Sequence, residues 1–267
     1  MGPKTKADKD RVLAFVKANP NRSLAEVAQA PHAGRGAENC EGAQRSEEEV
    51  RMIHPSVHVR FFGPFAAFVG EKKDEPCSYS APTPSAARGM LEAVLWRPAI
   101  LWHILRVHIL KPIRWFTMRV NEVEDRYEEG RPVVIENCRT QRTLTGLRDV
   151  DYVIEAAFSF TPKKGPEEDA KKFFDMLKRR VSLGQCRFQP YMGRRDFTAF
   201  FEPAPETFAQ DTSLRGRTID LGMMALDRHY GKTIVQEFFR AEIKDGVLVE
   251  KGKDTLPVFY PNGGNGA

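Results

Sequence analysis

The sequence predicts an α+β domain of the ferredoxin-like type, with an inserted β-hairpin and a small C-terminal β region. Between residues 55 and 203, segments rich in β-branched and aromatic residues alternate with two segments of helical periodicity. Their order is strand, helix, strand, hairpin, strand, helix, strand, which is the split βαβ arrangement. The chain has 267 residues, 41% of them hydrophobic, and is therefore long enough to bury a substantial core.

The first strand and the first helix are expected within residues 56–98. The stretch "SVHVRFFGPFAAFV" is typical of a strand, and we expect Gly63-Pro64 to interrupt it. The helix is predicted over Ser85–Trp96, and Pro98 ends it. Its apolar stripe consists of Ala86, Met90, Ala93 and Val94.

The middle of the domain is expected to hold one long strand, an insertion and a further strand. Residues 99–120 are apolar almost throughout and predict a single strand. Residues 121–149 are polar with short β-like pieces, which suits an inserted hairpin. Residues 150–161, "VDYVIEAAFSFT", alternate as a strand does.

The last part of the chain predicts a helix followed by short strands. Residues 165–186 form the helix, with four apolar residues directed inward: Phe173, Met176, Leu177 and Val181. The stretch "FTAFFEP" at 197–203 is the next strand. Further on, "DGVLVEKG" contains Asp245-Gly246, a pair typical of a β-turn.

These patterns divide the chain at residues 50 and 203. Residues 1–50 are an N-terminal extension with two short helical patterns, one of which begins with the capping box of Ser23 and Glu26. Residues 51–203 form the ferredoxin-like domain, and residues 204–267 the C-terminal β region and a flexible tail. The extension is either a flexible arm or a DNA-reading element. A third helix that could enter a groove is missing, which disfavours DNA reading.

Composition favours a cytoplasmic protein and permits a polyanionic partner. Forty-one Lys and Arg residues against 36 Asp and Glu residues give a net charge of +5 and a pI near 9.0. The four cysteines are scattered, which is typical of free thiols in a reducing compartment. No apolar run is long enough to span a membrane, and the N-terminus lacks the apolar core of a secretory signal.

Basic residues gather in several segments, with Trp115 and Phe116 between some of them. The candidates for RNA binding are Arg88, Lys111, Arg114, Arg119, Lys178, Arg194 and Arg195, and Lys171 and Lys172 lie on the second helix. Cations that hold phosphates, interleaved with rings that stack on bases, suit single-stranded nucleic acid. Alternatively, these residues form solvated faces with ion pairs such as Glu167–Lys171 and Glu168–Lys172.

Six segments occur in an order that resembles one known family. They are "VRFFGPFAAF", "SYSAPTPSAARGMLEAVLWRPAI", "LKPIRWFTMRVNEV", "DVDYVIEAAFSF", "KKFFDMLKRRVSLGQCRFQPYMGRRDFTAFFEP" and "FFRAEIKDGVLVE". Together they resemble the Cas-five family of type I-C CRISPR systems, the Dvulg subtype. The resemblance covers roughly residues 55–250, and "PTPSAARGMLEA" and "LKPIRW…RVNEV" are its most specific parts.

The resemblance implies an RNA-binding fold of the repeat-associated type and a place in an RNA-guided surveillance complex. The expected partners are the 5′ handle of the CRISPR RNA (crRNA) and its precursor, the backbone and large subunits of a type I-C complex, and indirectly target DNA. No membrane partner is expected. In this subtype the same subunit usually cuts the precursor without metal or cofactor: a 2′-OH attacks the adjacent phosphate, leaving a 2′,3′-cyclic end.

The chain departs from the family at the residues that support this cut. Cutting members carry Tyr or His just before the tryptophan that ends the first helix, and this chain has Leu95, which cannot transfer a proton. Their Lys-His pair corresponds to Lys171 and Lys172, which are expected to stabilise phosphate charge.

Two functions therefore remain open: an endoribonuclease, or a non-catalytic structural subunit that caps the handle. A substitute acid–base group is sought among His103, His108, Tyr79 and Tyr191. The two histidines equally suit a structural role inside a strand. A DNA-binding transcription factor acting through the N-terminal helices is the third alternative.

Overall fold

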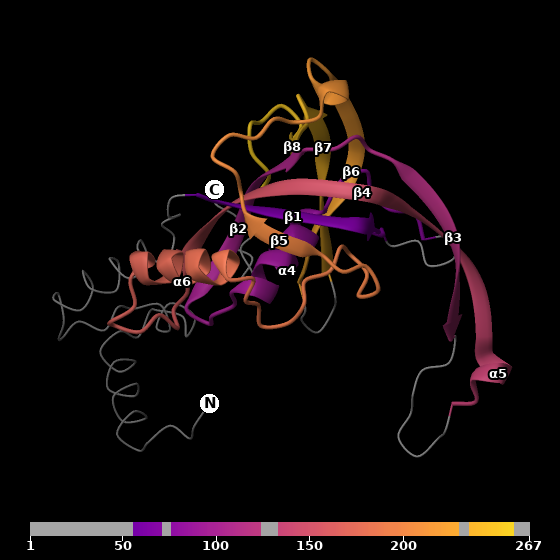
Figure 1. Cartoon of the computed structure of the whole chain (residues 1–267), viewed down its shortest axis with the longest axis horizontal. Coiled ribbons are helices and arrows are strands. Elements are labelled where there is room, and N and C mark those ends of the chain that lie inside the picture. Colours follow the sequence, from indigo (N-terminus) through magenta and orange to yellow (C-terminus); the bar gives the residue numbers. More distant parts are fainter. Residues whose placement is uncertain (1–55, 71–75, 124–132, 230–234, 259–267) are drawn as a thin grey trace, which may run out of the picture. The chain divides into compact units, whose positions relative to one another are not determined.

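The computed structural model describes residues 56–70, 76–123, 133–229 and 235–258 (Figure 1). The predictions for residues 1–50 lie outside the described residues. Within the described part of the chain, no helix is long and apolar enough to cross a membrane.

The sheet confirms the predicted ferredoxin-like arrangement. Strands β1 (Val57–Ala66), β2 (Ile100–Ile109), β4 (Arg139–Phe160) and β5 (Phe200–Pro203) follow the order β5-β1-β4-β2, with every neighbouring pair antiparallel. Strands β1 and β2 are therefore parallel to each other, with β4 between them, as a split βαβ unit requires.

Helices α4 (Pro84–Val94) and α6 (Ala170–Ser182) cover one face of this sheet (Figure 1). Thr83 and Asp169 cap their N-termini by accepting hydrogen bonds from backbone N–H groups of the first turn. The core lies between helices and sheet, where the ring of Phe158 in β4 packs 6.1 Å from that of Phe173 in α6.

The expected single strand over residues 99–120 is wrong, because β2 ends at Ile109 and β3 (Trp115–Val123) begins only after a turn that contains Pro112. Strand β3 pairs with the first half of the 22-residue strand β4, and the short helix α5 (Ile135–Cys138) precedes β4. This long hairpin is the predicted insertion.

The C-terminal strands continue the same sheet. Strands β6 (Thr218–His229) and β7 (Val235–Lys244) form a hairpin, and β8 (Val247–Glu250) joins β7 to β2. A short 3-10 helix (Thr212–Leu214) precedes β6. The predicted Asp245-Gly246 turn is confirmed, with both residues at positive φ (52° and 76°).

Two further boundaries differ from expectation. Strand β1 runs through Gly63-Pro64 without ending, and the ladder with β4 omits only Pro64, which has no N–H to donate. Helix α6 begins at Ala170 and not at 165, because the Glu168 carboxylate accepts the Gly165 N–H (3.0 Å) in a preceding turn. The expected i,i+4 pairs of Glu167 and Glu168 therefore do not form within a helix.

Candidate nucleic-acid interface

The C-terminal end of α4 is joined to α6 by hydrogen bonds to backbone carbonyls. Arg180 of α6 donates from Nη1 to the Val94 carbonyl at 2.6 Å, and the Arg187 N–H donates to the Ala93 carbonyl at 2.8 Å. These bonds satisfy carbonyls that the end of a helix leaves open. They also bring the segment after α6 against the end of α4.

An aromatic and cationic surface forms at this junction. Trp96 is 45% exposed, and the Arg187 guanidinium lies 4.9 Å from its ring centroid. Arg97 is exposed and lies 3.8 Å from the Met176 sulfur on α6. A ring with one open face beside arginines is a suitable platform for a nucleotide base.

The predicted lysines of α6 are all exposed, but they lie on different sides of the helix. Lys172 is one turn before Met176 and therefore lies on the side that faces the end of α4. Lys171 is rotated by about 100° and lies nearer to the side of Lys178. Lys178 borders a groove with the start of β1. Lys172 is thus the better placed of the two lysines to act with Trp96 and Arg97.

Leu95 is fully buried, although it lies between the exposed end of α4 and Trp96. It is the C-cap of the helix, its N–H donates to the Leu91 carbonyl, and its own carbonyl accepts the Trp102 indole N–H at 2.9 Å. A side chain at this position points into the core. It therefore cannot reach a phosphate in this geometry.

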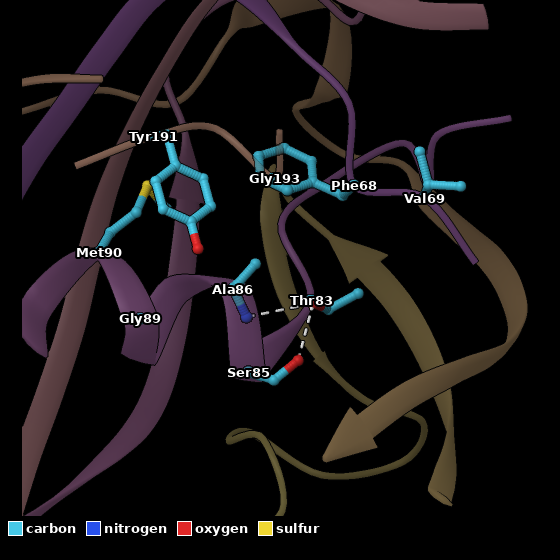
Figure 2. Close-up of a pocket in the computed structure, with 9 residues that line it drawn as sticks. All are labelled: Phe68, Val69, Thr83, Ser85, Ala86, Gly89, Met90, Tyr191 and Gly193. Atoms are coloured by element: carbon cyan, nitrogen blue, oxygen red, sulfur yellow. Dashed lines mark hydrogen bonds between the residues drawn. The ribbon is translucent and has the colours of Figure 1, made fainter. Parts of the chain in front are cut away.

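A second feature is a pocket of about 260 Å³ at the N-terminal half of α4 (Figure 2). Thr83 and Ser85 contribute hydroxyl groups to its lining, and Gly89 has no side chain to cover its backbone. The Tyr191 phenol faces the helix from the opposite wall. The first turn of α4 carries no acidic residue. A helix N-terminus favours negative charge, so the pocket is compatible with a phosphate group.

The glycine loop, residues 190–196, forms one wall of this pocket and is held tightly against the end of β1. Gly193 has φ of +81°, and a Cβ atom there would lie 2.1 Å from the Ala67 carbonyl oxygen. The Ala67 N–H donates to the Met192 carbonyl at 2.9 Å. Only glycine permits this approach.

The two arginines of the glycine loop have different partners. Arg194 is paired with Glu122 of β3 (3.1 Å) and with Asp196 (3.3 Å), so it joins the loop to the hairpin. Arg195 is exposed. Of the two predicted residues, Arg195 has the more accessible charge.

Arg88 is partly buried where α4 meets the C-terminal hairpin. Its side chain is 19% exposed and forms an ion pair with Asp227 of β6, whose side chain is 8% exposed, and a second with Glu92 at 3.5 Å. Burial raises the pKa of Glu92, against the opposing effect of the Arg88 charge. This arginine joins α4 to the C-terminal hairpin.

The predicted cations near β3 form a separate group. Lys111 and Arg114 both pair with Asp149, at 2.6 and 3.4 Å, and these side chains are about half exposed. Arg119 is exposed and lies on the face of β3 opposite the one that carries Glu122. Figure 1 places β3 and α6 at opposite ends of the sheet, so the structure does not bring these two groups together.

The substitute acid–base candidates differ in access. His103 is 1% exposed and lies 2.7 Å from the Ser159 hydroxyl, and His108 is 9% exposed, with its Nδ1 3.1 Å from the Gln210 side-chain amide. Both are interior residues of β2, as the structural interpretation expected. Tyr79 is partly buried against the core. Tyr191 lines the pocket.

Trp96, Arg97 and Arg187 form one surface that the sequence did not predict. The available signal was an arginine directly beside an aromatic residue, in "LWRP" and again in "CRFQP". Their contact is not visible in the sequence, because the two segments are about ninety residues apart.

Comparison with known proteins gives consistent similarities. The chain matches the family model described as "CRISPR-associated protein (Cas_Cas5)" over residues 56–256. A protein of Mannheimia succiniciproducens, named "CRISPR pre-crRNA endoribonuclease Cas5d", is 38% identical over 224 residues, which are 76% of this chain and 96% of that protein. One of the same name from Thermus thermophilus is 37% identical over 170 residues, 63% of this chain and 71% of that protein.

A solved structure described as "Crystal Structure of CRISPR-associated Protein" has a similar fold. It superimposes with a TM-score of 0.58 at 20% identity, over 78% of this chain and 98% of the other. At this identity the likeness concerns the fold.

Proposed function

The chain belongs to the CRISPR-associated Cas5 family, of the type I-C kind, and we propose from this premise that it binds and processes precursor crRNA. The observation that carries the proposal is the 38% identity over 96% of a protein named as a pre-crRNA endoribonuclease. The exposed lysines of α6 beside Trp96, and the pocket at the start of α4, support it because they suit phosphates and bases.

The cleavage that this arrangement supports is transesterification within the RNA. The 2′-OH attacks the adjacent phosphorus, the P–O5′ bond breaks, and the products are a 2′,3′-cyclic phosphate and a 5′-OH. Lys171 and Lys172 are the proposed catalytic residues, which stabilise the additional negative charge on the phosphate in the transition state. The proposed RNA-binding residues are Lys178, Arg194, Arg195 and the group of Lys111, Arg114 and Arg119.

Arg88 contributes indirectly, by joining α4 to β6. We also propose that the protein binds the backbone and large subunits of a type I-C surveillance complex. In that complex it would hold the 5′ handle of the crRNA.

A second candidate function is that of a non-catalytic subunit that only caps the handle. The observation that favours it is Leu95, which is buried and cannot transfer a proton. Loss of one positioned acid–base group costs about 10²–10⁴ in rate. In this alternative the same surface binds RNA without cutting it.

Incubation of the purified full-length protein with its own labelled repeat RNA in EDTA distinguishes the two. Cleavage at one site at the base of the repeat stem supports the enzyme, and a 2′-deoxy substitution at that site should abolish it. Tight binding that leaves the RNA intact would instead establish the capping function.

Lys171→Ala tests the role of the predicted lysine within that assay. We expect cleavage to fall more than binding, because the charge acts on the transition state. Equal losses of cleavage and binding would make Lys171 a phosphate clamp. Lys178→Ala, which removes a proposed RNA-binding charge from the same helix, should instead lower cleavage and binding to a similar extent.

A further inference from the structure

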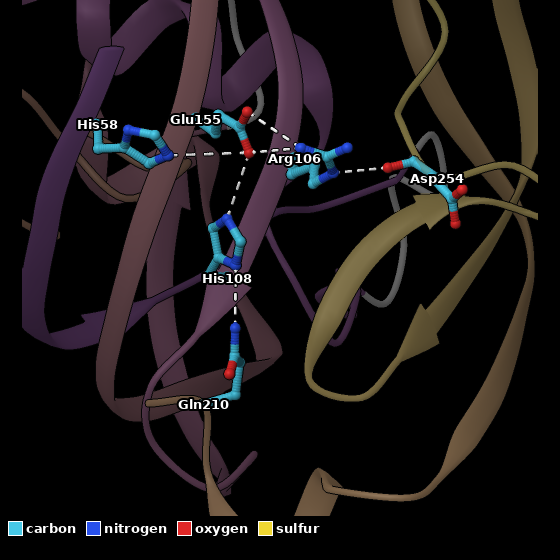
Figure 3. Close-up of polar contacts among 6 residues, drawn as sticks. All are labelled: His58, Arg106, His108, Glu155, Gln210 and Asp254. Atoms are coloured by element: carbon cyan, nitrogen blue, oxygen red, sulfur yellow. Dashed lines mark hydrogen bonds and ion pairs between the residues drawn. The ribbon is translucent and has the colours of Figure 1, made fainter. Parts of the chain in front are cut away.

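Two histidines and a glutamate lie together on the face of the sheet opposite the helices (Figure 3). His58, His108 and Glu155 come from three neighbouring strands, β1, β2 and β4. Each offers one ligand atom, and these three atoms all lie within 4.8 Å of one another. Nε2 of His108 is 3.5 Å and Nε2 of His58 is 3.9 Å from the same oxygen, Oε2 of Glu155.

A bulge in β2 places His108 on this face. Trp102 packs on the helix side against Phe158, so simple alternation would direct residue 108 to the helix side as well. The pairing with β4 shifts between Ile104 and Arg106, which exchanges the two faces beyond that point. His58 needs no such device, because it pairs directly with Glu155 in the β1–β4 ladder.

The three side chains are prepared to act as ligands. The Arg106 guanidinium lies 3.1 and 2.9 Å from the two oxygens of Glu155, and a cation at this distance favours the ionised carboxylate. The Gln210 amide lies 3.1 Å from Nδ1 of His108 and fixes its ring, with Nε2 directed at Glu155. Within the described part of the chain, that buried Nε2 has no hydrogen-bond partner.

We propose that His58, His108 and Glu155 form a binding site for a divalent transition metal ion, with Zn²⁺ as the reference ligand. Zn²⁺ takes imidazole nitrogens and carboxylate oxygens at about 2.0–2.2 Å in a tetrahedron, which sets neighbouring ligand atoms about 3.3 Å apart. The distances from Glu155 Oε2 to the two histidines are 3.5 and 3.9 Å, and all three ligand atoms lie within 4.8 Å of one another, so the side chains must draw together when the ion binds. Three protein ligands leave one position for water.

Arg106 shares the Glu155 carboxylate with the proposed ion, because its Nη1 contacts both oxygens, Oε2 at 2.9 Å included. Oε1, at 3.1 Å, keeps this partner while Oε2 binds the metal. Ligating carboxylates in proteins are commonly held by such a second hydrogen bond. Arg106 also donates from Nε to the Asp254 carbonyl at 2.6 Å (Figure 3).

The ion would tie three strands and one covering segment into a single unit. The Phe208 ring lies 6.0 Å from His58 and 5.0 Å from His108, and Gln210 follows two residues later. This segment connects β5 to the C-terminal hairpin. The site is therefore structural, and it is independent of the proposed RNA cleavage on the helix side.

The test uses the untagged full-length protein after dialysis against EDTA. Zn²⁺ at 100 times its Kd should raise Tm by about 5 °C or more, and Co²⁺ should give the visible absorption of a tetrahedral site. His58→Asn removes the ligand with the most exposed side chain and should weaken Zn²⁺ binding at least about tenfold. Glu155→Gln should abolish binding, if it folds.

The control variants are Cys77→Ser and Cys186→Ser, which remove two thiols outside the site and should leave Zn²⁺ affinity unchanged. Binding that is absent below about 10⁻⁴ M Zn²⁺, or that is equal in wild type and His58→Asn, would overturn the proposal. Loss of binding in a cysteine variant with retention in His58→Asn would overturn it too.

Discussion

Helices α4 and α6 each carry basic residues that look equivalent in the sequence, but their surroundings differ. Arg88 of α4 is mostly buried and paired with Asp227 of another element. Lys171 and Lys172 of α6 are exposed. The difference shows that accessibility and pairing decide whether a basic side chain is available to contact RNA or instead stabilises the fold.

The largest expected effect comes from Arg88→Ala. It leaves the Asp227 carboxylate buried without its compensating charge, which should lower the free energy of unfolding by about 3–5 kcal/mol. Urea denaturation measures this loss. Combining Arg88→Ala with Asp227→Asn should recover part of it. An unchanged stability together with a large loss of RNA affinity would show that Arg88 faces RNA.

The stability of the protein at acid pH tests the contribution of Glu155, which lies on the sheet face opposite the helices. The pKa of Glu155 is lowered from 4.5 to about 2 in the folded state. A lowered folded pKa contributes stability that is present above the unfolded pKa and is lost as pH falls from about 4.5 to about 2. The loss should be about 3 kcal/mol in unfolding experiments.

Glu155→Gln should remove this part of the pH dependence, since the amide does not titrate. The matched control is Glu202→Gln, at an ion pair whose acidic side chain is 44% exposed and which should alter the profile far less. Identical profiles for wild type and Glu155→Gln would contradict the assignment.

Lys172→Ala tests the exposed lysines of α6. Cleavage should fall by about 10²-fold through loss of transition-state stabilisation, while the free energy of unfolding stays within about 0.5 kcal/mol. Single-turnover cleavage and urea denaturation measure the two quantities. A destabilised protein with normal cleavage would reverse the roles assigned to α4 and α6.

Trp96→Ala should have a smaller effect, on binding. Removing the ring that Arg187 covers on one side should weaken RNA binding by about 1–2 kcal/mol, or roughly tenfold, in a filter or fluorescence assay. Trp96→Phe keeps an aromatic face and should retain most of the affinity. If both variants bind RNA with the affinity of the wild-type protein, the exposed ring does not stack on a base.

The smallest effect is expected for Lys111→Ala. The half-exposed pair with Asp149 should contribute only about 0.2–1 kcal/mol to stability. If Lys111 contacts a phosphate, binding should weaken for all sequences and the salt dependence should decrease by about one unit of slope. An unchanged slope would assign Lys111 to the turn alone.

The sequence predicted local elements better than contacts between them. Hydrophobic periodicity located α4 and α6 to within a few residues, and Asp245-Gly246 located a hairpin, because these signals depend on near neighbours. The strand over 99–120 was predicted as one because both halves are apolar. The break between Ile109 and Trp115 separates them, and the two strands pair with different halves of β4.

The site was predictable in residue types but not in arrangement. Lysines on a helix were visible, whereas the pairing of Arg88 with Asp227 joins residues far apart in the chain. The same is true of Trp96 and Arg187, and of His58 with Glu155. His108 reaches Glu155 only because of a bulge in β2, which apolar patterning does not reveal.

Strand β4 has a consequence for the order of folding during synthesis. It pairs with β1, β2 and β3, so the centre of the sheet is made of residues 139–160. Strand β1 must wait for roughly a hundred further residues, about 5–20 s of translation, before its central partner exists. During that time both edges of β1 lack a partner strand, which leaves its apolar residues open to aggregation.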